Sequence, residues 1–306
     1  MIFCCFLLIS LCFFYAIIVL IGEFMGEFKR YKSIDDVELC GIYCKCENSK
    51  KVIIHTHGMG GNFYENRFVS DMEHLYLEKG YSFVSFNNRG HDYFSDLLLG
   101  ESKTIKGGSA YELFEDCVLD IEGVILSLKD IGYEEFILSA HSFGCNKIVY
   151  SYNLLKDKYN ITSLILLAPC DIYKQLSFMI KNYDDYILEN KMQVLDNNYY
   201  SFVPNGLFPL EFTAKTVYNN FSKNSNADIF KYREIGYKSE LLNSVNIPVH
   251  IFIGLKDECV FTNKKEFIEK FLKDNFSCCD INYIDNAKHI FKGYEKKLIE
   301  SIGSVL

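Results

Sequence analysis

The 306-residue sequence contains no lysine- or arginine-rich tract, and its formal net charge is -8. Proteins that bind nucleic acids usually carry a basic face that neutralises the phosphates. The charge balance therefore argues against a nucleic-acid partner.

None of the twelve cysteines forms a C-x-x-C pair, the spacing typical of a structural zinc site. Cys44 and Cys46 are too close together for such a site, and Cys278 directly precedes Cys279. The chain is also long enough to bury a large core without disulfide bonds. We therefore interpret most of the cysteines as small buried hydrophobic residues of a protein in a reducing compartment.

Charged side chains are also missing from residues 1–22, which form an apolar run about long enough to cross a bilayer. The run has neither the basic start nor the A-x-A-like cleavage site of a secretory signal peptide. Basic residues follow at positions 29, 30 and 32, and the positive-inside rule would keep the rest of the chain in the cytoplasm. We expect residues 1–24 to be a transmembrane anchor. The alternatives are that Met25 is the true start, which would make the protein simply cytoplasmic, or that the run is a secretory signal.

Beyond this run, short β-rich segments alternate with amphipathic stretches across residues 25–306. This alternation predicts an α/β fold with a mostly parallel central sheet and helices on both faces. Residues 110–129 are expected to form one amphipathic helix, since apolar residues recur at helical spacing and acidic residues fall between them. The expected strands are residues 51–55, 81–86, 136–139, 163–168, 248–254 and 280–284.

Residues 172–246 break this rhythm. A structureless loop of that length is unusual in a compact domain, so we expect a mainly helical insertion that acts as a lid. Its aromatic residues could line an apolar pocket or attach the lid to the body of the protein, and both interpretations stay open. They are Tyr173, Phe178, Tyr183, Tyr186, Tyr199, Tyr200, Phe202 and Phe208.

The motif with the most chemical content is Ala140-His141-Ser142-Phe143-Gly144, which lies between a predicted strand and a helical run. Small residues on either side of a serine at such a junction are typical of a nucleophile elbow, whose tight turn exposes the hydroxyl. The start of the next helix adds N–H groups beside the developing negative charge. Ala140 departs from the glycine more usual at the first position. A five-residue pattern also occurs by chance, so the strand and helix around it carry much of the argument.

A second motif, His57-Gly58-Met59-Gly60-Gly61, follows the first clear strand. It lacks both the G-K-[ST] ending of a phosphate loop and the G-x-G-x-x-G spacing. Together the two motifs resemble those of the α/β-hydrolase superfamily, and the resemblance covers about residues 35–300. It implies an oxyanion hole formed by the backbone N–H groups of Met59 and Phe143.

In the same superfamily an acid and a histidine follow the nucleophile in chain order. Asp257 follows the strand 248–254 and His289 follows the last predicted strand, so both match the expected positions. Asp171, just after the strand 163–168, is the alternative acid. The predicted catalytic residues are thus Ser142, Asp257 and His289.

These residues predict a serine hydrolase that cleaves a carboxylic ester or thioester of a small-molecule or acyl substrate through an acyl-enzyme, with no metal and no cofactor. The alternatives are an amidase or peptidase with the same triad, or a non-catalytic binding protein on a hydrolase scaffold. The segments THGMGGNFYENRF, NNRGHD and GSAYELFEDCVLDI also resemble a little-characterised hydrolase group that includes fungal siderophore esterases.

Overall fold

The computed structural model describes residues 26–207, 210–261 and 264–306. The expected anchor, residues 1–24, lies outside these ranges, as does Phe208 of the insertion. Among the described helices, none has the length and apolar character needed to span a bilayer.

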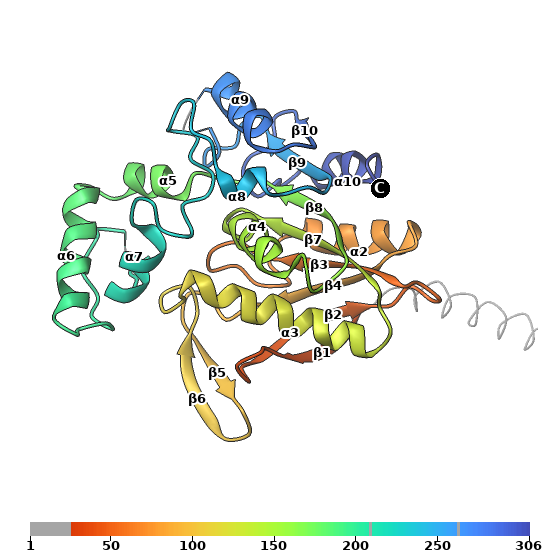
Figure 1. Cartoon of the computed structure of the whole chain (residues 1–306), viewed down its shortest axis with the longest axis horizontal. Helices are drawn as coiled ribbons and strands as arrows, with labels where there is room; N and C mark the ends of the chain where they lie inside the picture. Colours follow the sequence, from red (N-terminus) through yellow and green to blue (C-terminus); the bar gives the residue numbers. More distant parts are fainter. Residues whose placement is uncertain (1–25, 208–209, 262–263) are drawn as a thin grey trace, which may run out of the picture.

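An eight-stranded mixed sheet forms the centre of the molecule (Figure 1). The strands from β4 to β10 in the spatial order run parallel, whereas β1 and β2 are antiparallel to their neighbours. The start of β1 lies at the amino edge of the parallel strands. Glu27 pairs with Tyr43 at the end of β2, and the next residue, Cys44, pairs with Phe83 near the start of β4. The spatial order is β1 (Glu27–Lys32), β2 (Glu38–Cys44), β4 (Ser82–Asn87), β3 (Lys51–Thr56), β7 (Glu135–His141), β8 (Ile161–Leu167), β9 (Val249–Gly254) and β10 (Cys279–Ile284).

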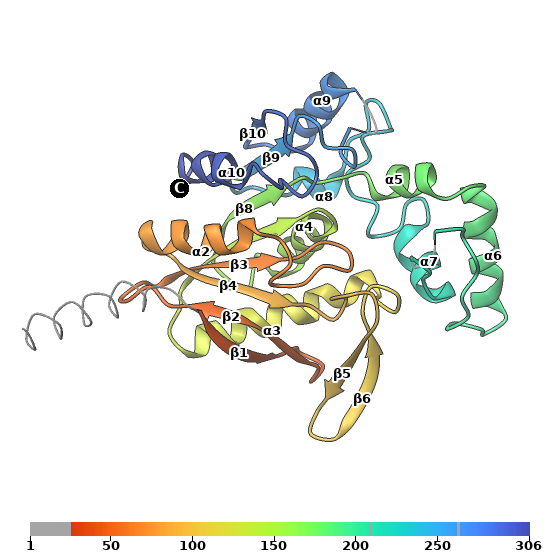
Figure 2. The same ribbon diagram turned by 180° about the vertical axis from the view of Figure 1, so that it is seen from behind.

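Helices cover both faces of this sheet (Figures 1 and 2). On one face α3 (Cys117–Asp130) packs beside α4 (Phe143–Leu155), and on the other α2 (Phe68–Glu78) packs beside α10 (Glu295–Gly303). A further helix, α9 (Lys265–Asn275), lies next to β10. The predicted α/β architecture is confirmed, and all six predicted strands are observed within two residues of their expected bounds.

The helix expected over residues 110–129 begins later than predicted. A single 3₁₀ turn, η1 (Phe114–Asp116), precedes α3, so the α-helix starts at Cys117. Upstream of it, the N–H of Phe114 bonds to the side chain of Asn220 in the insertion, and the Glu112 carboxylate bonds to Lys147. These tertiary contacts hold residues 110–113 out of the helix that their sequence pattern favours.

The insertion contains α5 (Ile172–Met179), α6 (Tyr183–Leu195), α7 (Ala214–Phe221) and α8 (Glu240–Asn243), joined by irregular segments. In Figure 1, α5, α6 and α7 form a group at one end of the sheet, away from α2 and α10. Tyr183 and Tyr186 are buried within this group, whereas Phe178 and Tyr200 are exposed.

A two-stranded hairpin, β5 (Ser95–Leu99) and β6 (Lys103–Gly107), projects from the body beside the insertion (Figure 1). Neither this hairpin nor the antiparallel strands β1 and β2 were among the predicted strands.

Candidate active site

Ser142 occupies a sharp turn between the end of β7 and the start of α4. Its backbone has φ 56° and ψ −127°, a strained conformation that side-chain-bearing residues seldom adopt. Gly144 makes the turn sterically possible, because a Cβ there would lie 2.6 Å from the carbonyl oxygens of Thr56 and His57. Ala140 is fully buried in β7, so its methyl group fits without a glycine.

His289, in the loop after β10, faces the serine. Its Nε2 lies 2.8 Å from the Ser142 Oγ, and its Nδ1 lies 3.0 Å from each carboxylate oxygen of Asp257. Three side chains that are far apart in sequence therefore form one hydrogen-bonded line at the carboxyl edge of the sheet.

Asp257 is fully buried in the loop after β9. Its Oδ1 accepts hydrogen bonds of 2.9 Å from the backbone N–H groups of Cys259 and Val260, which fix the orientation of the carboxylate. Burial acts to lower the pKa of His289, but hydrogen bonds with Asp257 and Cys259 outweigh it and raise that pKa above the ordinary 6.5. The environment thus stabilises the imidazolium, the form that a general base acquires when it accepts a proton.

Asp171, the alternative acid, is also fully buried but has different partners. It caps α5 by accepting the Lys174 N–H at 3.0 Å, and it bonds to the Arg233 guanidinium at 2.6 Å. Asp228 shares the same guanidinium. The carboxylate beside His289 is that of Asp257, whereas the contacts of Asp171 hold α5 against the loop that carries Arg233.

The loop that contains Met59 lies directly against the serine. A Cβ on Gly58 would lie 3.0 Å from the Ser142 Cβ. The backbone N–H of Asn88 donates to the Nε2 of His57, so the proton of this buried imidazole sits on Nδ1 and is donated to the Gly58 carbonyl at 2.8 Å. Burial, together with the nearby Lys147, lowers the pKa of His57 well below 6.5, which keeps the ring neutral. Because the Gly58 carbonyl and the Met59 N–H belong to one peptide group, this bond fixes the direction of that N–H.

Phe143, the second predicted oxyanion residue, is the first residue of α4, where helical N–H groups have no partner within the helix. Its ring lies under the ammonium group of Lys147, which is 5.4 Å from the ring centroid.

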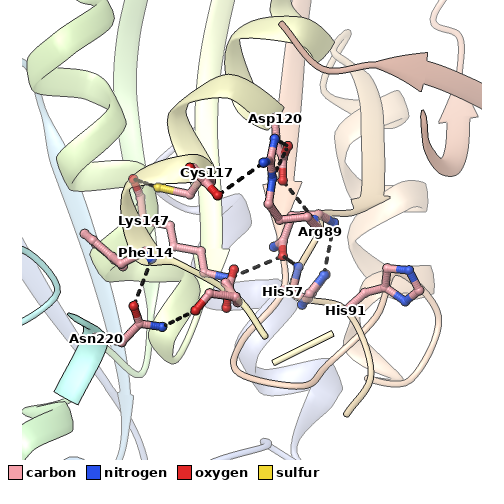
Figure 3. Close-up of polar contacts among 12 residues, drawn as sticks. His57, Arg89, His91, Phe114, Cys117, Asp120, Lys147 and Asn220 are labelled. Carbon is pink, nitrogen blue, oxygen red and sulfur yellow. Dashed lines mark hydrogen bonds and ion pairs between the residues drawn. The ribbon is translucent and has the colours of Figure 1, made fainter. Parts of the chain in front are cut away.

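A buried ion pair that the sequence analysis did not identify includes Lys147, which lies near both His57 and Phe143 (Figure 3). Lys147, on α4, bonds to Glu112 at 2.5 Å and to the side chain of Asn88 at 3.2 Å, and both charged side chains are almost completely inaccessible. A buried pair of this kind is costly to disrupt, since removal of one partner leaves an uncompensated charge. It links the helix after Ser142 to the loop that sets the His57 tautomer. The sequence signal was a lysine near the start of a mainly apolar helix.

A second buried charge cluster supports the same loop from the other side. Arg89 makes a bidentate contact with Asp35 and also bonds to Asp120, which is fully buried on α3 (Figure 3). An acidic residue that falls between the apolar positions of this helix is therefore not always exposed. Asp120 is buried, and Arg89 neutralises its charge inside the protein.

A cavity of about 430 Å³ opens over the serine and the histidine. The aromatic residues proposed as pocket-lining are absent from its described walls; Tyr183 and Tyr186 instead pack inside the insertion. Most of its lining is apolar, and half of the lining residues come from the insertion, which makes the site suited to an apolar group of a substrate. The lining residues are Met59, Gly60, Tyr93, Ser109, Ser142, Gln175, Leu176, Met179, Leu207, Leu210, Phe212 and His289.

Comparison with known proteins gives matches at the level of structure. No protein-family model matches the chain, and no curated protein matches its sequence. The esterase Est1E from Butyrivibrio proteoclasticus, in its form with bound ferulic acid, superposes with a TM-score of 0.63 at 16% identity, over 90% of this chain and 96% of that one. The Pyrococcus furiosus esterase Pf2001 gives a TM-score of 0.56 at 17% identity, over 92% of each chain.

An alpha-beta serine hydrolase homologue from Coxiella burnetii is similar over 93% of this chain and 99% of its own, with a TM-score of 0.53 and 16% identity. These matches extend over nearly the whole chain and agree with the sheet order and the strand–turn–helix at Ser142. The chain therefore has the α/β-hydrolase fold.

Proposed function

We propose that this protein is a serine hydrolase that cleaves a carboxylic ester or thioester through an acyl-enzyme. His289 accepts the Ser142 proton as Oγ attacks the carbonyl carbon, and Asp257 holds the imidazole tautomer and stabilises the imidazolium. The backbone N–H groups of Met59 and Phe143 donate to the oxyanion, where loss of one such donor typically costs about 3–4 kcal/mol. The imidazolium then protonates the leaving group, and a water activated by His289 releases the acyl group.

One observation carries the proposal: the hydrogen-bonded line from Asp257 through His289 to Ser142 ends at the wall of an apolar cavity. A structural hydrogen-bond network would not require a strained backbone at its serine. The fully formed line also argues against a binding protein on a hydrolase scaffold, since loss of catalysis would leave nothing to maintain all three residues.

The cavity favours a small-molecule or acyl substrate with an apolar group beside the scissile bond. The relationship of the chain to the siderophore-esterase group stays a prediction. The ester is preferred over the amide as the proposed substrate, and the amidase or peptidase activity remains the alternative to test.

An active-site fluorophosphonate probe tests the nucleophile. We expect it to label the wild type and to leave Ser142→Ala unlabelled, with Ser139→Ala as the matched control because Ser139 is buried in β7, which ends just before Ser142. Equal labelling of the wild type and Ser142→Ala would remove Ser142 from the nucleophile role.

A panel of p-nitrophenyl esters of increasing acyl length then measures the preference for the acyl group. A ferulate ester belongs in the panel, since ferulic acid is bound in the structure of Est1E. Matched amides and short peptides decide between the two chemistries. A higher kcat/KM for the amides would favour the amidase or peptidase alternative.

Membrane anchoring through residues 1–24, with the catalytic part in the cytoplasm, remains a separate prediction. Expression with and without these residues, followed by membrane fractionation, tests it. Equal recovery of both forms in the soluble fraction would contradict the anchor.

A further inference from the structure

Cys259 lies beside the proposed catalytic acid and base, and the proposed mechanism does not use its side chain. Its Sγ lies within 4.8 Å of a ring nitrogen of His289, and it accepts a hydrogen bond of 3.1 Å from the side-chain amide of Gln175. Gln175 and His289 both line the cavity, and Cys259 is itself partly exposed. The thiol thus lies next to two residues of the cavity wall.

The arrangement of Asp257, Cys259 and His289 meets the first requirement for metal binding. One potential ligand atom from each residue lies within 4.8 Å of the other two. Zinc–ligand bond lengths place the ligand atoms of a tetrahedral site roughly 3.3–3.8 Å apart, so the group needs to contract by about 1 Å. The Asp257 carboxylate is already fixed by the backbone N–H groups of Cys259 and Val260, and its oxygens already lie 3.0 Å from the Nδ1 of His289. The contraction therefore has to come from the Cys259 side chain.

The ligand types select the metal. A thiolate, an imidazole and a carboxylate suit Zn²⁺ and similar borderline-soft cations, whereas Mg²⁺ and Ca²⁺ prefer sites made only of oxygen atoms. Three protein ligands leave the fourth tetrahedral position open to water from the cavity.

We propose that these three residues form an inhibitory site for a thiophilic divalent cation such as Zn²⁺. The inhibition rests on the proposed function, because it acts through the catalytic base. When the metal binds, the thiol proton leaves to solvent and the sulfur donates its electron pair to the cation. If Nδ1 of His289 is the ligand atom, the imidazole proton moves to Nε2, which then has no electron pair for the Ser142 proton. If Nε2 is the ligand atom, the metal takes that electron pair directly. Both binding modes stop proton transfer.

Steady-state hydrolysis with buffered Zn²⁺ tests the inhibitory effect, with each variant normalised to its own metal-free rate under reducing conditions. We expect the wild type to lose its activity at micromolar Zn²⁺, to recover it on addition of EDTA, and to keep it in millimolar Mg²⁺ or Ca²⁺.

Cys259→Ser should need at least about tenfold more Zn²⁺ for half-inhibition, as loss of support for a metal site commonly costs ten- to a hundredfold in affinity. Cys278→Ser is the control, since Cys278 is an exposed cysteine just before β10. Equal Zn²⁺ sensitivity of Cys259→Ser and the wild type would overturn the site.

Binding of Co²⁺ to Ser142→Ala separates the metal site from the catalytic proposal. Co²⁺ replaces Zn²⁺ in such sites, and a thiolate ligand gives it a charge-transfer absorption in the near ultraviolet. We expect this band in Ser142→Ala and its loss in Ser142→Ala/Cys259→Ser. If the wild type hydrolyses no ester but Ser142→Ala shows the Cys259-dependent band, the metal site would be supported and the proposed function refuted. A protein without the band would refute the metal site whatever its activity.

Discussion

The loops after β8 and β9 offer a comparison within one molecule. These adjacent parallel strands each deliver a fully buried aspartate to the same edge of the sheet, Asp171 from one and Asp257 from the other. Asp257 lies against the imidazole of His289, with two backbone N–H groups behind it. Asp171 lies against the guanidinium of Arg233. Burial raises the pKa of Asp171, and Arg233 opposes that shift. Position after a strand thus makes both residues candidates, but the group that each carboxylate contacts determines its role.

The largest expected effect is the difference in kcat between two variants, each of which removes the charge of one aspartate. Asp257→Asn should lower kcat about 10,000-fold, because the amide no longer holds the correct tautomer of His289 or stabilises its protonated form. Asp171→Asn should lower it less than tenfold, since asparagine can still cap α5. Hydrolysis of a short p-nitrophenyl ester measures both. A greater loss from Asp171→Asn would reverse the assignment of the acid.

The second contrast concerns stability. Arg233→Gln should lower the free energy of unfolding by about 3–5 kcal/mol, because it leaves Asp171 and Asp228 buried without their shared cation. Urea denaturation measures this loss. Addition of Asp171→Asn to the Arg233→Gln variant should recover part of it by removing one of the uncompensated charges.

Lys270→Gln serves as the control for that experiment. Its ion pair with Asp274 is exposed, and a surface pair typically contributes at most about 1 kcal/mol. If Arg233→Gln lowered the free energy of unfolding no more than Lys270→Gln does, the buried pair would not stabilise the contact between α5 and its neighbouring loop.

The smallest effect is a shift in pH dependence. The neutral imidazole of His289, which acts as the base, is lost as the pH falls through the pKa of this residue. Because that pKa is raised above 6.5, the acid limb of the kcat/KM profile should lie above pH 6.5 in the wild type. Asp257→Asn removes the group that raises it, which should move the limb to lower pH. Asp171→Asn should leave the limb in place. A limb that moves equally in both variants would contradict the distinct roles of the two carboxylates.

The same two loops show how far the sequence alone could go. The apolar runs before Asp171 and Asp257 predict buried strands, and the chain order of serine, acid and histidine selects the three residues that the structure brings together. The partner of Asp171 was not predictable, since Arg233 lies within the insertion, where no local pattern indicates which charge meets which. Glu112 was missed for a related reason: only the fold brings it against Lys147, and this contact also delays the start of α3. Strands β1, β5 and β6 were missed because most of their side chains are exposed or only partly buried, so they lack the apolar runs of the central strands. Strand β2 was missed although it is mainly apolar.

The position of β1 has a practical consequence for experiments on the isolated protein. Glu27 lies at the amino edge of the parallel strands, whereas Ser142 and His289 lie at the carboxyl edge under the insertion. A tag or a solid support attached in place of residues 1–25 would therefore be joined to the side opposite the cavity mouth. Immobilisation through that end should leave the entrance facing bulk solution, with its access to dissolved substrate and metal ions preserved.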